Sequence, residues 1–341
     1  MNILITGTGG FIGSNVLWYL ANFTSHKLIC LDSFKFGMKS NAERLKLALK
    51  DIPNSRYTVM EWDLTHDFSQ PFVNQLLQHN VDVILNIASD SHVTRSISNP
   101  AACWFNNCTL IYNMLELSRK LKPKAFIQIS TDEVYGDAGW DGPGHPEWDA
   151  IVPSNPYSAS KAAQEALAIS YFRTYHVPLV LTNTMNVIGQ WQDPEKFLPK
   201  MIKRILNDEV ITLHADNIDA TPKVATRVWL DVKNMACALS FIISNLDKLD
   251  FNPRQRPPRF HLVGDVELSV LELTRIVASL LDKEPKYELV QGDKERPGYD
   301  RRYALVDNNL KAMGYSHPIP LQTTLNHIVD WVIANPNWVY E

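Results

Sequence analysis

A glycine-rich turn between an apolar strand and a helix is the feature that most restricts how this chain can fold. Residues 2–6 are expected to form a buried strand and residues 11–22 a helix, and Gly7, Gly10 and Gly13 give the turn between them a G-x-x-G-x-x-G spacing. Glycines there let the backbone approach a pyrophosphate closely, while the start of the helix offers free N–H groups and the positive end of its dipole. This strand–turn–helix context predicts a dinucleotide-binding site.

The first half of the chain alternates short apolar runs with helical patterns. Strands are expected at 27–31, 57–62, 81–86, 125–130 and 178–182, and helices at 70–79, 100–120 and 156–175. Continuous apolar strands that alternate with helices are typical of a parallel sheet covered on both faces, and right-handed crossovers make such a sheet doubly wound. We therefore predict an α/β fold with a Rossmann-type doubly wound parallel sheet.

After residue 183 the pattern loosens, which predicts a smaller mixed C-terminal substrate domain. Helical patterns cover 196–207, 232–246 and 269–282, the last with a capping-box pattern at Ser269 and Glu272. Residues 208–226 are polar and irregular, 252–259 are typical of a surface loop, and 228–230 could return to the sheet. The expected division is an NAD-binding domain of residues 1–184 with 227–262, and a substrate domain of residues 185–226 with 263–341.

Composition excludes several classes of protein. The 341 residues are 45% hydrophobic and carry a net charge of -4, and no run of five or more Lys and Arg indicates a nucleic-acid partner. The four cysteines form no Cys-x-x-Cys pair and no His lies at ligand spacing from Cys103 or Cys108, so we expect reduced thiols and no metal site. Neither a signal peptide nor an apolar segment of membrane-spanning length is evident, so we expect a cytoplasmic protein with no membrane partner.

Two carboxylates follow predicted strands at the edge where a dinucleotide would bind. Asp32 ends the second strand, about twenty residues beyond the glycine turn, where it can accept hydrogen bonds from both ribose hydroxyls. It would repel a 2′-phosphate, so the predicted cofactor is NAD and not NADP. Asp63 ends the third strand and is placed to reach the adenine edge, although a plain turn role fits both residues as well.

A tyrosine and a lysine one helical turn apart are the first candidates for catalysis. Tyr157 and Lys161 lie near the start of the helix at 156–175 and share one of its faces. A free phenol has a pKa of about 10, and a nearby ammonium together with a positive nicotinamide ring favours the phenolate. The pair can then remove a hydroxyl proton during hydride transfer. The same spacing occurs by chance in many helices, so alone it decides little.

Adjacent acidic residues strengthen this interpretation. Asp132 and Glu133 follow Ser130 and Thr131 at the end of the fifth strand, the edge where open α/β sheets place their ligands. If their surroundings separate the two pKa values, one carboxyl acts as an acid and the other as a base. Elimination of water needs that division. The alternative is a solvated acidic turn without a catalytic role.

These motifs together resemble the extended short-chain dehydrogenase/reductases. Within that family, the Thr131-Asp132-Glu133 segment is similar to the dTDP-glucose 4,6-dehydratase group. Residues 91–97 (SHVTRSI) are similar to the group's S-H-V-D-R-S-I segment, residues 296–303 (RPGYDRRY) to its R-P-G-H-D-R-R-Y segment, and residues 194–196 to its P-E-K. The resemblance covers residues 1 to about 335.

The resemblance implies dehydration of a nucleotide-diphosphate sugar with NAD regenerated in each turnover. Tyr157 would take the proton of the C4 hydroxyl, which Thr131 positions, while hydride passes from C4 to NAD. Glu133 would remove the C5 proton as base, Asp132 would protonate the departing C6 hydroxyl as acid, and hydride would return to C6. Lys161 would bind the nicotinamide ribose and lower the pKa of Tyr157.

The resemblance also assigns binding residues. The implied cofactor site comprises Gly7, Gly10, Phe11, Ile12, Gly13, Asp32, Asp63, Leu64, Ala88, Asn107, Ser130, Tyr157 and Lys161. The implied substrate residues are Ser91, Asn186, Lys196, Arg227, Arg296 and Tyr299, with the two arginines as phosphate-pairing cations.

The chain departs from the group in the segments expected to hold the nucleotide. A short G-D-G turn is replaced by the longer residues 215–223, Val228 replaces an Asp, His261 an Asn, and Tyr299 a His. These departures leave the base undecided between dTDP-glucose and a UDP-sugar. A sugar epimerase or decarboxylase on the same fold, and a non-catalytic NAD-binding protein, are the alternatives to a dehydratase.

Members of the group usually form homodimers through a four-helix bundle. The helices at 104–120 and 156–175 would supply it here. The expected apolar seam consists of Ile111, Met114, Leu115, Ala163, Leu167 and Tyr171. Burial of the same residues against the sheet is the alternative.

Overall fold

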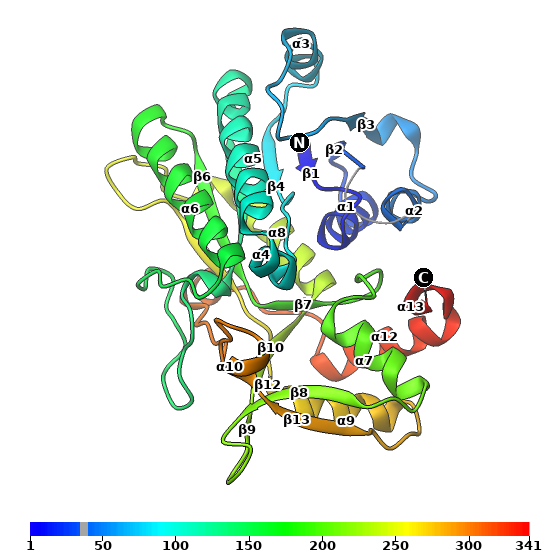
Figure 1. The fold of residues 1–341 in the computed structure, drawn as a ribbon. Helices are drawn as coiled ribbons and strands as arrows, with labels where there is room; N and C mark the ends of the chain where they lie inside the picture. Colours follow the sequence, from blue (N-terminus) through cyan, green and yellow to red (C-terminus); the bar gives the residue numbers. More distant parts are fainter. Residues whose placement is uncertain (35–39, 341) are drawn as a thin grey trace.

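The centre of the molecule is a parallel sheet with helices on both faces (Figure 1). The computed structural model describes residues 1–34 and 40–340, and in these residues the sheet has seven strands in the order β11-β6-β5-β4-β1-β2-β3. The strands are β1 (Asn2–Thr6), β2 (Lys27–Asp32), β3 (Tyr57–Glu61), β4 (Val83–Asn86), β5 (Ala125–Thr131), β6 (Leu179–Thr184) and β11 (Arg259–Leu262). The order reverses between β1 and β4, so the predicted doubly wound sheet is confirmed.

Alternate side chains of the buried strands face the two helical layers, as the pleat of a strand requires. In β1, Ile3 and Ile5 pack in one apolar cluster with Leu17, while Leu4 lies in a second cluster with Met114. The first layer contains α1 (Phe11–Phe23), α2 (Ser40–Ala48) and α8 (Val232–Ser244), and the second contains α3 (Gln70–Gln78), α5 (Pro100–Leu121) and α6 (Pro156–Tyr175). Both faces are therefore closed to solvent.

A smaller lobe lies below the carboxyl ends of these strands (Figure 1). The described residues form two three-stranded sheets there, β12-β10-β7 and β13-β8-β9. Their strands are β7 (Asn186–Ile188), β8 (Ile211–Asp216), β9 (Lys223–Val224), β10 (Thr226–Asp231), β12 (Glu267–Ser269) and β13 (Tyr287–Gln291), and the main helices of the lobe are α7 (Phe197–Leu206), α9 (Val270–Leu280) and α12 (Leu321–Ala334). These helices share an apolar cluster with β8 and Trp229 of β10.

Shorter helical segments connect the main elements. They are α4 (Val93–Ser98), α10 (Gly292–Glu295), α11 (Asn308–Ala312), α13 (Asn337–Tyr340), η1 (Asn54–Arg56), η2 (Asp132–Val134) and η3 (Leu246–Lys248). The capping box predicted at Ser269 and Glu272 is confirmed at the start of α9.

Three expectations for the second half of the chain are wrong. Residues 208–226 are not irregular, because β8 buries Ile211, Leu213 and Ala215 on one face. Residues 228–230 do not return to the main sheet, since β10 pairs with β7 and β12 and only the following helix α8 packs against α1. Arg259 does not end a surface loop, because it begins β11 and is 2% exposed. The two-domain division itself stays a prediction.

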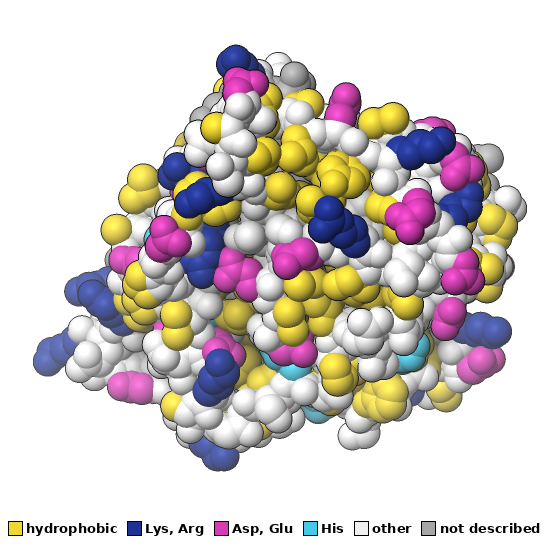
Figure 2. All heavy atoms as spheres, turned by 90° about the horizontal axis from the view of Figure 1, so that it is seen from below, with side chains coloured by type: hydrophobic (Ala, Val, Ile, Leu, Met, Phe, Trp, Pro, Cys, Tyr) yellow, Lys and Arg dark blue, Asp and Glu magenta, His cyan; other side chains and the backbone are white. Residues whose placement is uncertain are grey.

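Three further features concern the helices, the lower face and the acidic and metal-ligating side chains. No helix in the described part of the chain is long and apolar enough to cross a bilayer. Figure 2 shows basic and acidic side chains interspersed over the lower face of the molecule. Within residues 1–34 and 40–340, no group of three or more His, Cys, Asp or Glu is placed to hold a metal ion.

Candidate active site

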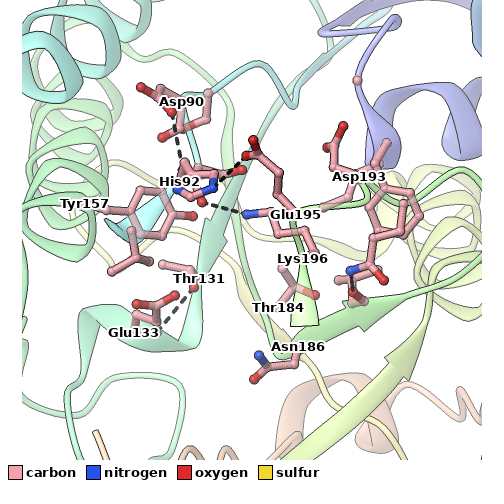
Figure 3. A pocket seen from close by; sticks show the side chains of 18 of the residues that line it. Asp90, His92, Thr131, Glu133, Tyr157, Thr184, Asn186, Asp193, Glu195 and Lys196 are labelled. Atoms are coloured by element: carbon pink, nitrogen blue, oxygen red, sulfur yellow. Dashed lines mark hydrogen bonds and ion pairs between the residues drawn. The ribbon is translucent and has the colours of Figure 1, made fainter. Parts of the chain in front are cut away.

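A cavity of about 920 Å³ runs from the switch point of the main sheet into the smaller lobe. Residues of both lobes line it, from the glycine turn at one end to β8 and Tyr299 at the other. In Figure 3, Thr131, Glu133 and Tyr157 lie together on one side, with Asn186 and Lys196 facing them from the smaller lobe. Clefts at the carboxyl edge of an open α/β sheet are where such folds bind their ligands.

The glycine turn leaves room for a phosphate group next to the start of α1. Gly7 has a φ of +71°, and a Cβ atom there would lie 2.9 Å from the Cα of Ala88. A Cβ on Gly13 would lie 1.9 Å from the carbonyl oxygen of Gly7, so a side chain at this position would push the helix away from the turn. Gly10, Phe11 and Ile12 line the cavity. The turn therefore fits a pyrophosphate at the helix N-terminus.

Asp32 and Asp63 both reach the cavity from the ends of β2 and β3. One oxygen of Asp32 accepts a hydrogen bond from the Gly9 N–H at 2.8 Å and the other accepts from the Phe34 N–H at 2.9 Å. These bonds fix the carboxylate beside the glycine turn, where the ribose of a dinucleotide is expected. Asp63 accepts from the backbone and hydroxyl of Thr65, and Leu64 lies beside it in the cavity wall.

Asn107 supports the wall from behind. It is fully buried on α5, where its amide oxygen accepts from the Asp90 N–H at 2.9 Å and its amide nitrogen donates to the Asp90 carbonyl at 3.0 Å. Ala88 and Ser130, in contrast, lie in the wall itself. Asn107, which was expected in the cofactor site, therefore lies beneath the segment that lines the cavity and not in the wall itself.

The carboxyl end of β5 holds the acidic pair in a tight turn. The hydroxyl of Thr131 donates to Asp132 at 2.9 Å, and the Glu133 N–H donates to the same carboxylate oxygen at 3.0 Å. From the neighbouring strand β6, the amide of Asn183 donates to the Thr131 carbonyl at 3.0 Å. Asn155, the capping residue of α6, donates to a carboxylate oxygen of Glu133 at 3.1 Å. The sequence did not indicate this contact of Asn155 with Glu133.

The surroundings raise the pKa of both carboxyl groups. Burial, followed by the charge of Glu133, raises the pKa of Asp132 to about 7. Burial also raises the pKa of Glu133, while the charges of Arg296 and Arg227 and the hydrogen bond from Asn155 oppose that rise. In the described residues, the second carboxylate oxygen of Asp132 is buried without a hydrogen-bond partner. An oxygen of that kind is suited to a group of a ligand.

Tyr157 lies beside this acidic turn and is 8% exposed. Burial and the charges of Glu133 and Asp132 raise its pKa well above 10, and a hydrogen bond with Thr131 opposes the rise. Burial and the two carboxylates dominate in the chain by itself, so the lowering of the Tyr157 pKa by Lys161 and a bound nicotinamide stays a prediction.

Lys161 lies one turn further along α6. Its ammonium donates to the Ile129 carbonyl and to the side chain of Gln164, each at 2.7 Å. Burial lowers its pKa to about 8. An ammonium has a third N–H, and Lys161 lines the cavity, so it is placed to contact a bound ribose.

The six residues assigned to the substrate all line the cavity, but they differ in their hydrogen-bond partners. Lys196 donates to the Ser91 carbonyl at 3.0 Å, which joins the two walls. The amide oxygen of Asn186 and the Nε of Arg296 are buried without partners among the described residues. These atoms are open to hydrogen bonding with a ligand.

Arg227, another of these residues, is held in place by several backbone carbonyls. Its guanidinium donates to the carbonyls of Thr226, Asp300 and Arg301 at 2.7 to 3.0 Å and stacks 4.2 Å from the Tyr303 ring. It holds the 300–303 segment against β10, a role that the sequence did not indicate.

His261, one of the departures expected near the nucleotide, lies elsewhere. It is fully buried in β11, where its ring contacts the Tyr135 hydroxyl at 2.9 Å and the Val306 carbonyl at 2.8 Å. Burial lowers its pKa to about 3, so the ring is neutral. The expectation that this position bears on the nucleotide is wrong, whereas Tyr299 lines the cavity and packs edge-to-face on His214.

Three contacts that the sequence did not reveal lie at the rim of the cavity. Glu195 pairs with His92 at 3.0 Å and with Arg95 at 3.4 Å, as Figure 3 shows for His92. At the cofactor end, Arg44 of α2 is 1% exposed at its side chain and pairs with Asp193 at 2.7 Å.

The C-terminal segment supports Arg44 at that end of the cavity. The Arg44 guanidinium lies 5.2 Å from the centre of the Trp338 ring, and the Trp338 indole donates to the Gln192 carbonyl at 2.9 Å.

A doubly wound sheet with a glycine turn, a Tyr–Lys pair and an acidic turn in one cavity defines an NAD-dependent enzyme of the short-chain dehydrogenase/reductase class. Residues 3–252 match the model of the NAD dependent epimerase/dehydratase family, and the chain belongs to that family. Its cofactor is NAD.

Individual relatives lie at modest identity over the full length. A low-salt glycan biosynthesis protein of Haloferax volcanii is 32% identical over 98% of this chain and 99% of its own. A dTDP-glucose 4,6-dehydratase of Shigella flexneri is 31% identical over 99% of this chain and 94% of its own. The crystal structure of a dTDP-glucose 4,6-dehydratase from Streptomyces venezuelae with NAD bound superposes with a TM-score of 0.82 at 25% identity, over 99% of this chain and 98% of that one.

Proposed function

We propose that the protein is a nucleotide-sugar 4,6-dehydratase, which converts an NDP-hexose to the NDP-4-keto-6-deoxyhexose. The observation that carries the proposal is the position of two carboxyls, Asp132 and Glu133, beside Tyr157 in one cavity. Of the side chains, an oxidation at C4 needs only the tyrosine beside the hydride acceptor, whereas loss of water across C5 and C6 also needs a base and an acid. The similarity to the dTDP-glucose 4,6-dehydratase of Shigella flexneri supports this choice.

The first role belongs to Tyr157, which takes the proton of the C4 hydroxyl while Thr131 orients that hydroxyl. When bound, NAD would supply the hydride-transfer chemistry and a positive ring that favours the Tyr157 phenolate. Lys161 holds the ribose with its third N–H. The glycine turn and Asp32 hold the remainder of the cofactor, as their geometry in the cavity fits.

The acidic pair performs the elimination. The ketone at C4 acidifies the C5–H, and Glu133 removes that proton as base. Asp132 protonates the C6 hydroxyl, which leaves as water. The raised pKa of Asp132, about 7, keeps a proton on this carboxyl in a large fraction of molecules at neutral pH. Glu133 then gives a proton back to C5 when C6 is reduced.

The substrate lies between the walls of the two lobes in this proposal. Ser91, Lys196 and Asn186 bind the sugar and its phosphates, and Arg296 pairs with the diphosphate. Arg227 contributes a positive charge while holding the 300–303 segment. Tyr299 contacts the nucleotide end. dTDP-glucose is the first candidate donor, and UDP-glucose or another UDP-sugar is the second, because residues 215–223 and Tyr299 depart from the group.

A mass measurement tests the proposed function. The purified protein with NAD is incubated separately with dTDP-glucose, UDP-glucose and UDP-N-acetylglucosamine, and Tyr157→Phe serves as the inactive control. Loss of one water from one donor, with no net reduction of NAD, is the expected result. A product of unchanged mass with an inverted C4 configuration would instead identify an epimerase, and no product from any donor would contradict the dehydratase.

We also propose that the protein forms a homodimer through α5 and α6. The seam expected from the sequence is partly wrong, because Ile111, Met114 and Leu115 are buried against the sheet within one chain. Aromatic side chains on the outer face of these helices replace them. They are Trp104, Phe105 and Tyr112 of α5 and Tyr175 of α6, which are 46 to 67% exposed. An exposed apolar face of this kind on two packed helices favours a four-helix interface.

A further inference from the structure

A second carboxylate and a phenol lie behind the base Glu133. The Tyr303 hydroxyl is 3.4 Å from a carboxylate oxygen of Glu133 and 2.8 Å from a carboxylate oxygen of Asp300. Tyr303 and Asp300 are 5% and 4% exposed, and Tyr303 lines the cavity. Neither residue has a part in the reaction as described above.

The hydrogen of the phenol belongs to the shorter of these two contacts. A phenol has one O–H to donate and can also accept. Asp300 is the closer acceptor, and the hydroxyl of Ser154 donates to the same Asp300 oxygen, as expected for a carboxylate. With its hydrogen directed at Asp300, the Tyr303 oxygen presents a lone pair to Glu133. That arrangement suits a Glu133 that carries a proton.

The phenol cannot easily turn away from Glu133. The Arg227 guanidinium stacks 4.2 Å from the Tyr303 ring and donates to the Asp300 carbonyl at 2.8 Å and the Arg301 carbonyl at 3.0 Å. The other contact of Glu133, the amide of Asn155, is a donor, so it favours the ionised carboxylate. Both contacts are to the same carboxylate oxygen of Glu133, Oε2, which therefore has a donor beside it and, in the phenol, an acceptor for a proton of its own.

We propose that Tyr303, oriented by Asp300, is a positioning residue that accepts a hydrogen bond from protonated Glu133 and holds the C5 proton there until it is returned. The inference rests on the proposed dehydratase function. The C5–H bond breaks and the Glu133 O–H bond forms, with the electron pair left in the sugar enolate. The new O–H donates to Tyr303, whose own hydrogen stays with Asp300. The Glu133 O–H bond then breaks as the C5–H bond forms again.

The charged groups around Glu133 also affect its pKa. The groups facing it are Arg227, Arg296 and Lys196 with positive charge, Asp132 and Asp300 with negative charge, and the phenols of Tyr157 and Tyr303. The cations lower the pKa of Glu133, whereas burial and the charge of Asp300 raise it. Loss of the Tyr303 acceptor, or of the Asp300 charge, should therefore make Glu133 a weaker base.

Kinetics of Tyr303→Phe with deuterated donors test the inference. The donor is dTDP-glucose, or UDP-glucose if only that is converted, labelled at C5 in one series and at C4 in the other. We expect kcat to fall roughly 3- to 10-fold, as loss of one buried hydrogen bond predicts, with KM nearly unchanged. The C5 isotope effect should rise while the C4 effect does not, and the acidic limb of the kcat–pH profile should move to lower pH.

Two further variants keep the test decisive. Asp300→Asn should move the acidic limb in the same direction, because it removes a negative charge that faces Glu133. Tyr315→Phe is the matched control, since this buried tyrosine donates to the Asn234 carbonyl in the main apolar cluster away from the cavity. It should keep the wild-type isotope effects and pH profile.

The outcomes separate the inference from the proposed function. A folded Tyr303→Phe or Asp300→Asn variant with the wild-type C5 isotope effect and acidic limb overturns the role of Tyr303 and leaves the dehydratase intact. A wild-type protein that converts none of the three donors, dTDP-glucose, UDP-glucose and UDP-N-acetylglucosamine, overturns the proposed function and the inference with it.

Discussion

The acidic turn at residues 132 and 133 contains the two carboxyl groups proposed to transfer protons in the elimination. Asp132→Asn and Glu133→Gln keep the shape of the turn and remove one proton-transfer group each. We expect each variant to slow product formation by roughly 10²- to 10⁴-fold, as loss of general acid or base catalysis predicts. Affinity for NAD, measured by calorimetry, should stay at the wild-type value, because Asp32 and the glycine turn are unchanged. Wild-type turnover of Glu133→Gln would contradict the role given to this residue.

The buried carboxyl of Asp132 also predicts a pH-dependent stability. Its pKa is raised from 3.8 to about 7 in the folded protein, so between these values the folded state holds more protons than the unfolded chain. Stability must then fall as pH rises through this window. Asp132→Asn removes this contribution and should be more stable than wild type at pH 8 by on the order of 1–3 kcal/mol, and equally stable near pH 4. Urea unfolding at both pH values measures the difference, and an equal stability at pH 8 would contradict the expectation.

The candidate catalytic residues could be predicted from residue type and spacing, whereas the contacts that position the surrounding side chains could not. Thr131, Asp132, Glu133, Tyr157 and Lys161 all reach the cavity, because residues at the ends of parallel strands and on one helix face must meet at the sheet edge. The use of Arg227 on three backbone carbonyls could not be predicted, since it depends on where residues 300–303 return. Contacts between segments so far apart in the chain leave no local pattern in the sequence.

Among the elements, the strands of the main sheet were predictable and β8 was not. Continuous apolar runs such as residues 125–130 indicate burial on both faces, which leaves few alternatives. In β8, apolar residues alternate with Thr212, His214 and Asp216, so the strand is half-buried and its composition is that of a loop. The period-2 alternation at 211–216 was the available signal.

The exposed aromatic side chains on the outer face of α5 lead to a prediction about dimer formation. Phe105→Glu places a charge in the proposed interface and should convert a dimer to a monomer, as measured by sedimentation at micromolar concentration. Phe23→Glu on α1 is the matched control, because Phe23 is 63% exposed and Phe105 67% exposed. The control should sediment like the wild-type protein. A Phe105→Glu variant that also does so would contradict the proposed interface.

At the scale of the whole molecule, the cavity joins two lobes, so ligands should stabilise the complete chain. NAD at about 100 times its Kd is expected to raise the free energy of unfolding by about 2.7 kcal/mol, which is a shift of several degrees in Tm. Asp32→Ala should reduce the shift at the same NAD concentration, since the carboxylate beside the glycine turn is lost. Differential scanning fluorimetry measures both, and an undiminished shift in the variant would contradict the role of Asp32.

The contact between Trp338 and Arg44 has a consequence for the order in which the protein matures. A ribosome makes the glycine turn first and Trp338 some three hundred residues later, and the side of the cavity at α2 receives its last contact only then. At usual rates of about 5–20 residues per second, the nascent chain spends many seconds with that side incomplete. We therefore expect a chain stalled before residue 338 to hold the dinucleotide less tightly, because Arg44, which lines the cavity, then lacks the Trp338 ring packed on it.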